Sequence, residues 1–121
     1  MNAKKIMTNA EEIEVGQEHR EGVTILTPKG EIDLSRAPAL RTYLSQALLG
    51  RPARLIINLA HVPYMDSSGV ATFVEAMQLA RRKGSRLVLC DLQNRVRSIF
   101  EIARLDMVFT IVGTTEEALV A

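Results

Sequence analysis

The chain has 121 residues, enough for one domain with a sizeable core, and its apolar content of 47% and charged content of 24% are ordinary for a globular protein. Its formal net charge of +1 argues against nucleic acid as a direct partner, because a nucleic-acid-binding domain carries a surplus of Lys and Arg. No apolar run approaches the roughly 18 residues of a membrane span, so no membrane insertion is expected.

The beginning of the chain lacks hydrophobic periodicity, and residues 1–11 are expected to form a flexible tail ahead of a single domain at residues 12–121. The tail contains two lysines but no apolar core of a secretory signal. The single cysteine, Cys90, cannot form an internal disulfide, and both features favour a cytoplasmic protein. Cys90 lies in an apolar run, where a small buried side chain is expected rather than a reactive thiol.

Residues 12–29 show the pattern of two strands. Ile13 and Val15 alternate with glutamates, a polar turn containing Gly22 follows, and the alternation then resumes. This pattern predicts an antiparallel hairpin. Pro28 suits an edge position or the end of the second strand, because proline cannot donate a ladder hydrogen bond.

Two helices carry clear end signals. The first has Ser35 as its expected N-cap, Pro38 in its first turn and Gly50 as a left-handed residue beyond its end. The second ends with the basic run at 81–83, followed by Gly84. Because the dipole is negative at a helix C-terminus, we favour a solvated helix end over a phosphate site for this run. The expected buried faces are Ala37, Leu40, Leu44, Ala47 and Leu48 in the first helix, and Val70, Phe73, Val74, Met77 and Ala80 in the second.

The remaining pattern alternates strands with helices. Residues 55–59 and 86–90 are nearly continuous apolar runs, as expected of strands covered on both faces. A last strand is expected at 109–112, before a helical segment that opens with the capping-box pair Thr114 and Glu117. The order implies an α/β fold with a mixed sheet, in which the hairpin joins parallel β-α-β units and about four helices. A third helix is expected to be capped by Asp91 or Asn94 and to bury Val96, Ile99, Phe100 and Ala103.

The quartet Asp66-Ser67-Ser68-Gly69 stands out between the strand at 55–59 and the second helix. One N-cap needs one short polar side chain, and three occur here in a row, which predicts an exposed hydroxyl site as well as a helix start. Glycine in a helix costs up to about 1 kcal/mol relative to Ala, so we interpret Gly69 as bare backbone that permits close approach of a partner. A phosphate at this turn would meet free N–H donors and the positive end of the helix dipole.

Other kinds of chemistry find little support. The histidines His19 and His61 and the single cysteine show no metal-ligand spacing, and no Gly-rich phosphate loop occurs, so neither a metal nor a cofactor is expected. The enzymatic alternative is a serine hydrolase that uses Ser67 or Ser68. It lacks the G-x-S-x-G frame, and His61 would have to reach back across the connector. The prediction is a protein that is not an enzyme.

The chain resembles the STAS domain family across residues 12–121, in particular the bacterial anti-sigma factor antagonists. The resemblance rests on Gly30-Glu31-Ile32-Asp33 after the second strand, and on Asn58-Leu59 through Met65-Asp66-Ser67-Ser68-Gly69. Residues 95–100 and 109–119 add weaker support. The resemblance implies the STAS fold and a binding role in the regulation of transcription.

In that family the unphosphorylated protein binds an anti-sigma factor, which is also a serine kinase of the GHKL class, and thereby frees a sigma factor. The kinase phosphorylates the serine directly after the aspartate, which here is Ser67, with Ser68 as second choice. A PP2C-type phosphatase restores the binding form. Asp33 and Asp66 match acidic positions near that serine, so the resemblance implies a partner-binding surface of Asp33, Asp66, Ser67, Ser68 and Gly69.

STAS domains have other roles as well. Some are subunits of lipid-transport ABC systems and some belong to stressosome scaffolds, where a similar loop need not be phosphorylated. An intact Ser67 between Asp66 and a nearby Gly69 favours the phospho-switch over these alternatives.

Overall fold

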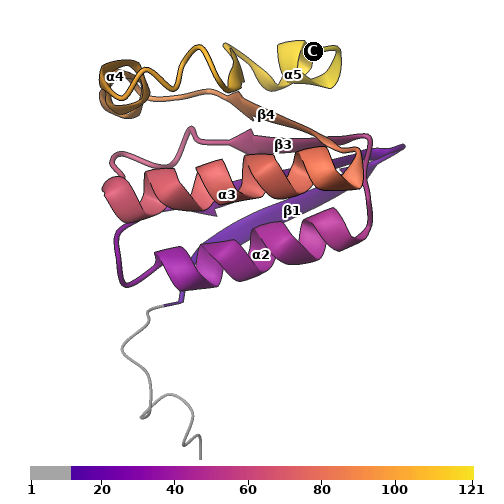
Figure 1. Ribbon diagram of the computed structural model, residues 1–121, viewed down its shortest axis with the longest axis horizontal. Coiled ribbons are helices and arrows are strands. Elements are labelled where there is room, and N and C mark those ends of the chain that lie inside the picture. The colour runs from indigo at the N-terminus through magenta and orange to yellow at the C-terminus, as the bar shows by residue number, and fades with distance from the viewer. Residues whose placement is uncertain (1–11) are drawn as a thin grey trace, which may run out of the picture.

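The computed structural model describes residues 12–121, and the predicted tail at 1–11 lies outside the described residues. In the described range, five strands form one sheet in the order β1-β2-β3-β4-β5, and four helices flank it (Figure 1). The elements are β1 Glu14–Arg20, β2 Val23–Lys29, α2 Ala37–Leu49, β3 Arg54–Asn58, α3 Ser67–Lys83, β4 Arg86–Cys90, α4 Asn94–Ile102, β5 Thr110–Val112 and α5 Thr115–Leu119.

The sheet is mixed, as the sequence predicts. Strands β1 and β2 pair antiparallel as a hairpin, while β2, β3, β4 and β5 pair parallel in sequence order. Gly22 closes the hairpin with a φ of 67°, a conformation that glycine adopts without strain. Pro28 lies beyond the stretch of β2 that pairs with β3, so its missing N–H interrupts no bond on that side.

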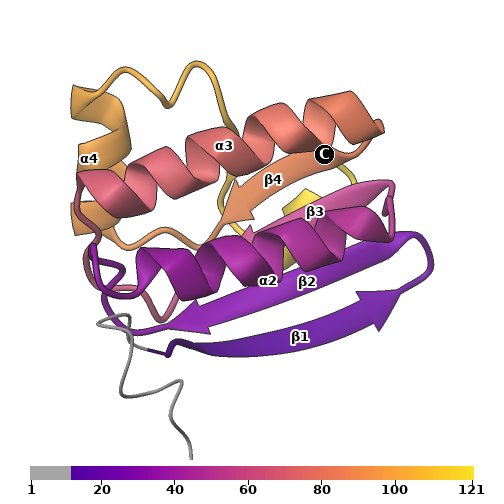
Figure 2. The same ribbon diagram turned by 60° about the horizontal axis from the view of Figure 1, so that its bottom comes forward.

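Helices cover both faces of the sheet (Figure 2). Helices α2 and α3 pack on one face over the larger core, to which α2 contributes Leu40 and Leu44 and α3 contributes Phe73. On the other face, Ala118 of α5 packs in a smaller apolar cluster that includes Cys90. Burial raises the pKa of the Cys90 thiol to about 11, so this cysteine is the expected inert core residue.

Helix α4 closes the larger core at one end. Its Val96 and Phe100 are fully buried, and the Phe100 ring meets the Phe109 ring edge to face with 5.3 Å between centroids. Ile99 is only partly buried. Ala103 is exposed, so the prediction that it belongs to the buried face of this helix is wrong. The helix ends at Ile102, which leaves Ala103 as the C-cap.

The predicted ends of α2 are wrong in detail. Arg36 occupies the N-cap position without a side-chain cap bond, and the expected cap Ser35 instead belongs to a turn before the helix. At the other end Gly50 has a φ of −74°, and Arg51 takes the left-handed conformation with a φ of 48°. The N–H of Arg51 donates to the carbonyl of Leu48 at 3.0 Å, so the chain reverses one residue later than expected.

The predicted cap of α4 is also wrong, because Gln93 is its N-cap and makes no side-chain cap bond. Asp91 has a φ of 57° and points its carboxylate at a different group of residues. It accepts hydrogen bonds from the Asn58 amide at 3.1 Å and the Thr115 hydroxyl at 3.4 Å. Asp91 therefore fastens α5 to the ends of β3 and β4 instead of capping α4.

Two other predicted helix ends are confirmed. Gly84 follows α3 with a φ of 75°, and the Thr114 hydroxyl accepts a hydrogen bond from the N–H of Glu117 at 3.1 Å. The last strand is shorter than predicted and begins at Thr110, because Phe109 is taken into the core against α4.

Candidate functional site

Two loops leave neighbouring parallel strands at the same edge of the sheet. The loop at 30–36 follows β2 and leads into α2, and the loop at 59–66 follows β3 and leads into α3. Because the carboxyl ends of parallel strands meet at one edge, the loops lie side by side (Figure 1). The edge of the sheet therefore brings the two sequence motifs together.

Backbone hydrogen bonds join the two loops. The N–H of Gly30 donates to the carbonyl of His61 at 2.9 Å, and the N–H of Ile32 donates to the carbonyl of Tyr64 at 3.0 Å. The N–H of Asp66 then donates to the carbonyl of Ile32 at 3.1 Å. Parallel pairing thus continues for a few residues beyond β2 and β3 and fixes the first residues of α3 relative to the loop before α2.

Asp66 is the N-cap of α3 and has an extended backbone conformation. Its Oδ1 accepts hydrogen bonds from the N–H of Ser68 at 2.8 Å and of Gly69 at 3.3 Å. Its Oδ2 accepts from the N–H of Leu34 at 3.2 Å. One carboxylate therefore satisfies the start of a helix and also holds the opposite loop.

Ser67 is the first residue of α3, and its side chain is exposed. Its hydroxyl makes no hydrogen bond to any group from residue 12 to residue 121, so it points freely into solvent. Ser68 is half-buried, and its carbonyl accepts a hydrogen bond from the Thr72 hydroxyl at 2.8 Å. Of the two serines, Ser67 is the more accessible to an incoming reactant.

Fewer N–H donors are available at this turn than the sequence predicts. The carboxylate of Asp66 already takes the N–H groups of Ser68 and Gly69, and its carbonyl takes that of Val70 at 3.1 Å. Among the first four residues of α3, the N–H of Ser67 is left without an acceptor in the described part of the chain. A phosphate on Ser67 would therefore meet this one donor and a carboxylate beside it.

Asp33 lies in the same pair of loops but serves the start of α2. Its Oδ1 accepts hydrogen bonds from the Ser35 hydroxyl at 2.7 Å and from the N–H groups of Ser35 and Arg36, each at 3.1 Å. The hydrogen bond from the Ser35 hydroxyl, aided by the two N–H groups, lowers the pKa of Asp33 below its ordinary value. Asp33 is thus a negative charge that holds the turn before α2 and engages the hydroxyl of Ser35, the residue predicted as the N-cap.

Gly69 is buried, which overturns its interpretation as bare backbone open to a partner. A Cβ at this position would lie 2.9 Å from the Cβ of Met65 and 3.0 Å from the Cγ2 of Ile32. It would also lie 3.1 Å from the carbonyl oxygen of Ile32. Glycine is required here because the two joined loops pass directly over the first turn of α3.

Two features near the site were not singled out in the sequence. Leu34 is 74% exposed, and its N–H is the one that Asp66 holds. The Arg95 guanidinium lies over the Tyr64 ring, 4.7 Å from its centroid. The sequence does contain a signal for Leu34, because a large apolar side chain is unusual in a polar loop. The contact between Tyr64 and Arg95 has no local signal, because it joins distant parts of the chain.

The arrangement does not provide a hydrolase site. The side chain of His61 is exposed and makes no hydrogen bond to Ser67, and the carboxylate of Asp66 is occupied by backbone N–H groups. No group of three or more potential metal ligands occurs in residues 12–121. In the same range, no helix has the length and apolar character needed to cross a membrane.

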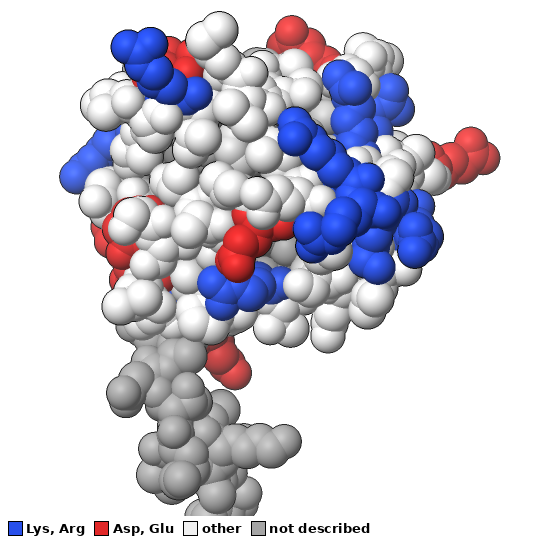
Figure 3. Space-filling view, viewed as in Figure 1, with Lys and Arg blue, Asp and Glu red and all other residues white. Residues whose placement is uncertain are grey.

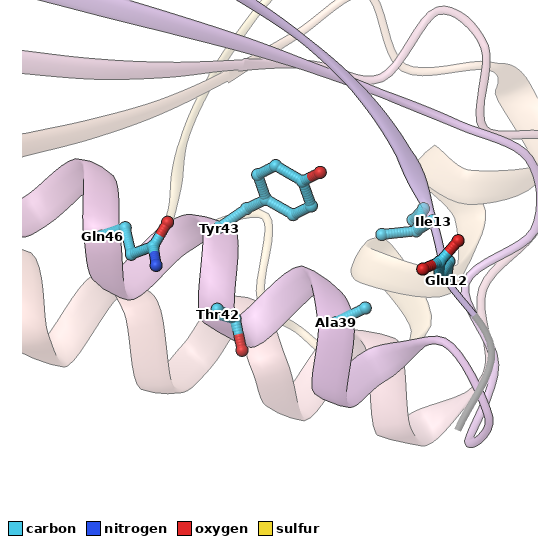
Figure 4. Close-up of a pocket in the computed structure, with 6 residues that line it drawn as sticks. All are labelled: Glu12, Ile13, Ala39, Thr42, Tyr43 and Gln46. Carbon is cyan, nitrogen blue, oxygen red and sulfur yellow. The ribbon is translucent and has the colours of Figure 1, made fainter. Parts of the chain in front are cut away.

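A cavity of about 530 Å³ lies elsewhere, between the start of β1 and helix α2 (Figure 4). Its lining includes Ile13, Tyr43 and the carboxylate of Glu12. It includes neither serine of the quartet and neither histidine, so it adds nothing to the chemistry of the site.

Known proteins resemble this chain in sequence and in fold. The STAS domain model matches residues 15–118. The anti-sigma-B factor antagonist of Listeria monocytogenes is 38% identical over 68% of this chain and 72% of its own length. The anti-sigma-B factor antagonist of Bacillus subtilis is 37% identical over 72% of this chain and 79% of its own length.

A solved structure has the same fold. The crystal structure of an anti-sigma factor antagonist from Mycobacterium paratuberculosis superposes with a TM-score of 0.82. It is 24% identical, and the match covers 89% of this chain and 92% of that one. The family model, the relatives and the fold agree: the chain belongs to the STAS domain family.

Proposed function

We propose that this protein is an anti-sigma factor antagonist controlled by phosphorylation of Ser67. Its unphosphorylated form binds an anti-sigma factor that is also a serine kinase of the GHKL class, and this binding frees a sigma factor. Phosphate on Ser67 ends the complex, and a PP2C-type phosphatase restores the binding form. The protein acts in the cytoplasm as a substrate and binding module, and it does not itself catalyse a reaction.

The exposed, unbonded hydroxyl of Ser67 carries this proposal. A kinase must bring the γ-phosphate of ATP in line with the attacking oxygen, which demands a hydroxyl free of other contacts on a rigid support. Ser67 meets both demands, because Asp66 holds the turn through Ser68 and Leu34. The names of the relatives, which are antagonists of anti-sigma factors, support the choice of partner.

The same geometry supplies a mechanism of release. Phosphorylation adds about 1.5 to 2 negative charges next to the Asp66 carboxylate. In the free protein water hydrates this dianion, but a partner that covers the turn would have to bury it beside a second anion. Since the donors of Ser68 and Gly69 are already taken, the protein itself offers little compensation. The affinity for the anti-sigma factor therefore falls, because binding would bury the charged phosphate beside Asp66 and remove its water.

The proposal is tested by purifying the tagged protein from its own cells and measuring intact mass together with its bound partners. The wild type should be isolated as a mixture of free phosphorylated protein and unphosphorylated protein bound to a kinase-like anti-sigma factor. The variant Ser67→Ala should carry no phosphate and retain more of that partner. Recovery of the permease and ATPase of a transport system, with no phosphate on either form, would contradict the proposal and favour the transporter alternative.

A further inference from the structure

Basic side chains gather at the end of α3 opposite to Ser67. Arg81, Arg82 and Lys83 form the last turn of the helix, and Arg86 opens β4 after the intervening turn. Arg51 joins them, because its Nη1 donates to the carbonyl of Lys83 at 3.2 Å. Figure 3 shows Lys and Arg side chains concentrated on the side of the molecule where α3 ends. These five residues form the basic patch.

The basic patch lacks acidic partners in the described part of the chain. Ion pairs at residues 12–121 include Glu18 with Arg20, Glu14 with Lys29, and Glu75 with Arg41, and no residue of the patch forms an ion pair in that range. The whole chain has a net charge of only +1, so the remainder of the sequence is net negative. The patch therefore carries five positive charges, while the acidic residues that balance them lie elsewhere in the sequence.

The helix dipole explains only part of this concentration. Cations in the last turn of a helix interact favourably with its negative end, which accounts for residues 81–83. Arg51 lies after α2 and Arg86 lies in β4, so neither belongs to the last turn of α3. Like charges brought close together repel one another, and an external anion would relieve that repulsion.

A cavity opens within the basic patch. Its volume is about 270 Å³, and its lining includes Arg81, Arg86, Met77, Leu87 and Val108. Val108 is 45% exposed, so one apolar side chain of the cavity is reached from solvent, in a lining that also contains the two arginines. Ser85 also lines the cavity, and its nearly buried hydroxyl finds no hydrogen-bond partner in the described residues.

We propose that the basic patch is a second docking surface, which binds an acidic segment of a partner protein. One apolar side chain of that segment enters the cavity, and carboxylates on either side of it pair with Arg81 and Arg86. A cavity lined by both Val108 and two arginines fits such a peptide, because it offers an apolar contact for an anchor as well as compensating charge. Nucleic acid would instead favour a longer basic stripe along the molecule.

The second surface is separate from the phosphorylation site. Helix α3 has 17 residues, so its two ends lie about 25 Å apart at 1.5 Å per residue. That distance exceeds the Debye length of about 8 Å at physiological salt, so phosphate on Ser67 acts only weakly on the basic patch. One molecule therefore offers both surfaces at the same time, and phosphorylation controls only the first.

The test measures fluorescence anisotropy of a labelled peptide that has glutamates on both sides of one leucine. A second peptide replaces that leucine with serine, and a third replaces the glutamates with lysines. The protein variants are Arg81→Glu combined with Arg86→Glu, a charge-matched control of Arg97→Glu combined with Arg104→Glu, and Ser67→Asp. Circular dichroism verifies the fold of each variant. Replacing Arg81 and Arg86 with Lys keeps the positive charge but removes the planar guanidinium groups, so this variant separates the effect of charge from the effect of bidentate hydrogen bonding.

We expect the wild type, the control and Ser67→Asp to bind the first peptide with similar affinity. For all three, the affinity should fall as the salt concentration rises. The charge-reversed variant should bind about tenfold or more weakly, since it turns two attractions into repulsions. The serine peptide should bind more weakly than the leucine peptide. Absence of wild-type binding, equal losses in the control, or tighter binding to duplex DNA or to phosphatidylserine vesicles would overturn the proposal.

Discussion

The carboxylate of Asp66 accepts a hydrogen bond from the N–H of Leu34 at 3.2 Å, although 32 residues separate them in the sequence. The other oxygen of the same carboxylate caps α3 through Ser68 and Gly69. A single side chain thus links the helix that carries Ser67 to the loop that leads into α2. This link explains how the turn is held rigid while the hydroxyl beside it stays free.

The link predicts a measurable loss of stability in Asp66→Ala. Removing an N-cap costs about 0.5–2 kcal/mol, and the orphaned N–H of Leu34 adds to that loss, so the free energy of unfolding should fall by about 1–3 kcal/mol. Urea denaturation measures the change. Asp106→Ala is the matched control, since Asp106 is exposed and no hydrogen bond to it is present in residues 12–121. Equal stability of the two variants would show that Asp66 does not hold the loops.

Gly69→Ala should also lower the free energy of unfolding. Alanine would gain up to about 1 kcal/mol in helix propensity, but its methyl group would be forced against Ile32 and Met65, and overpacking costs about 1–3 kcal/mol. Gly16→Ala is the control, because its Cβ would meet Thr27 at an ordinary 3.6 Å. An increase in the melting temperature of Gly69→Ala would contradict the close contact with the loops.

The lowered pKa of Asp33 predicts that the free energy of unfolding depends on pH in a definite direction. Its pKa in the folded protein is lowered from 3.8, chiefly by the hydroxyl of Ser35, so folding favours the charged form. The resulting stabilisation is present above the unfolded pKa and is lost as pH falls through the folded pKa. Ser35→Ala should therefore raise the pKa of Asp33 in an NMR titration and make acid unfolding less steep, whereas the control Ser98→Ala should leave both unchanged.

Much of this architecture is predictable from the sequence because it depends on periodic burial. Alternation at 12–29 and the apolar runs at 55–59 and 86–90 predict four of the five strands, β1 to β4. The quartet at 66–69 marks the start of α3 because helix N-termini require side-chain acceptors. These signals are local, and each one is complete within a few residues.

The errors arise where distant residues decide the outcome. Ser35 fits an N-cap by type, but its hydroxyl donates to Asp33 in the turn before α2. Asp91 is drawn away from α4 by Asn58 and Thr115. The interpretation of Gly69 as open backbone fails for the same reason, since the loop containing Ile32 fills the space above it. No pattern within one segment shows that another segment will lie across it.

Phosphorylation should perturb the structure only near Ser67. Because the Asp66 carboxylate already occupies the nearby N–H groups, the dianion has no new set of protein donors to reorganise. Backbone amide spectra of the two forms should therefore differ mainly at residues 30–36 and 64–72. Ser67→Asp should reproduce part of this change, since it adds less charge than phosphate. Large shifts throughout β3, β4 and α4 would instead indicate a conformational switch.

Phosphate transfer from the isolated kinase partner tests the central claim most directly. The measurement is intact mass with site mapping after incubation with ATP, comparing the wild type with Ser67→Ala and Ser68→Ala. We predict one phosphate on the wild type and on Ser68→Ala and none on Ser67→Ala, with the fold retained in all three. Undiminished phosphate uptake by Ser67→Ala, mapped to Ser68, would contradict the assignment of the exposed hydroxyl as the switch.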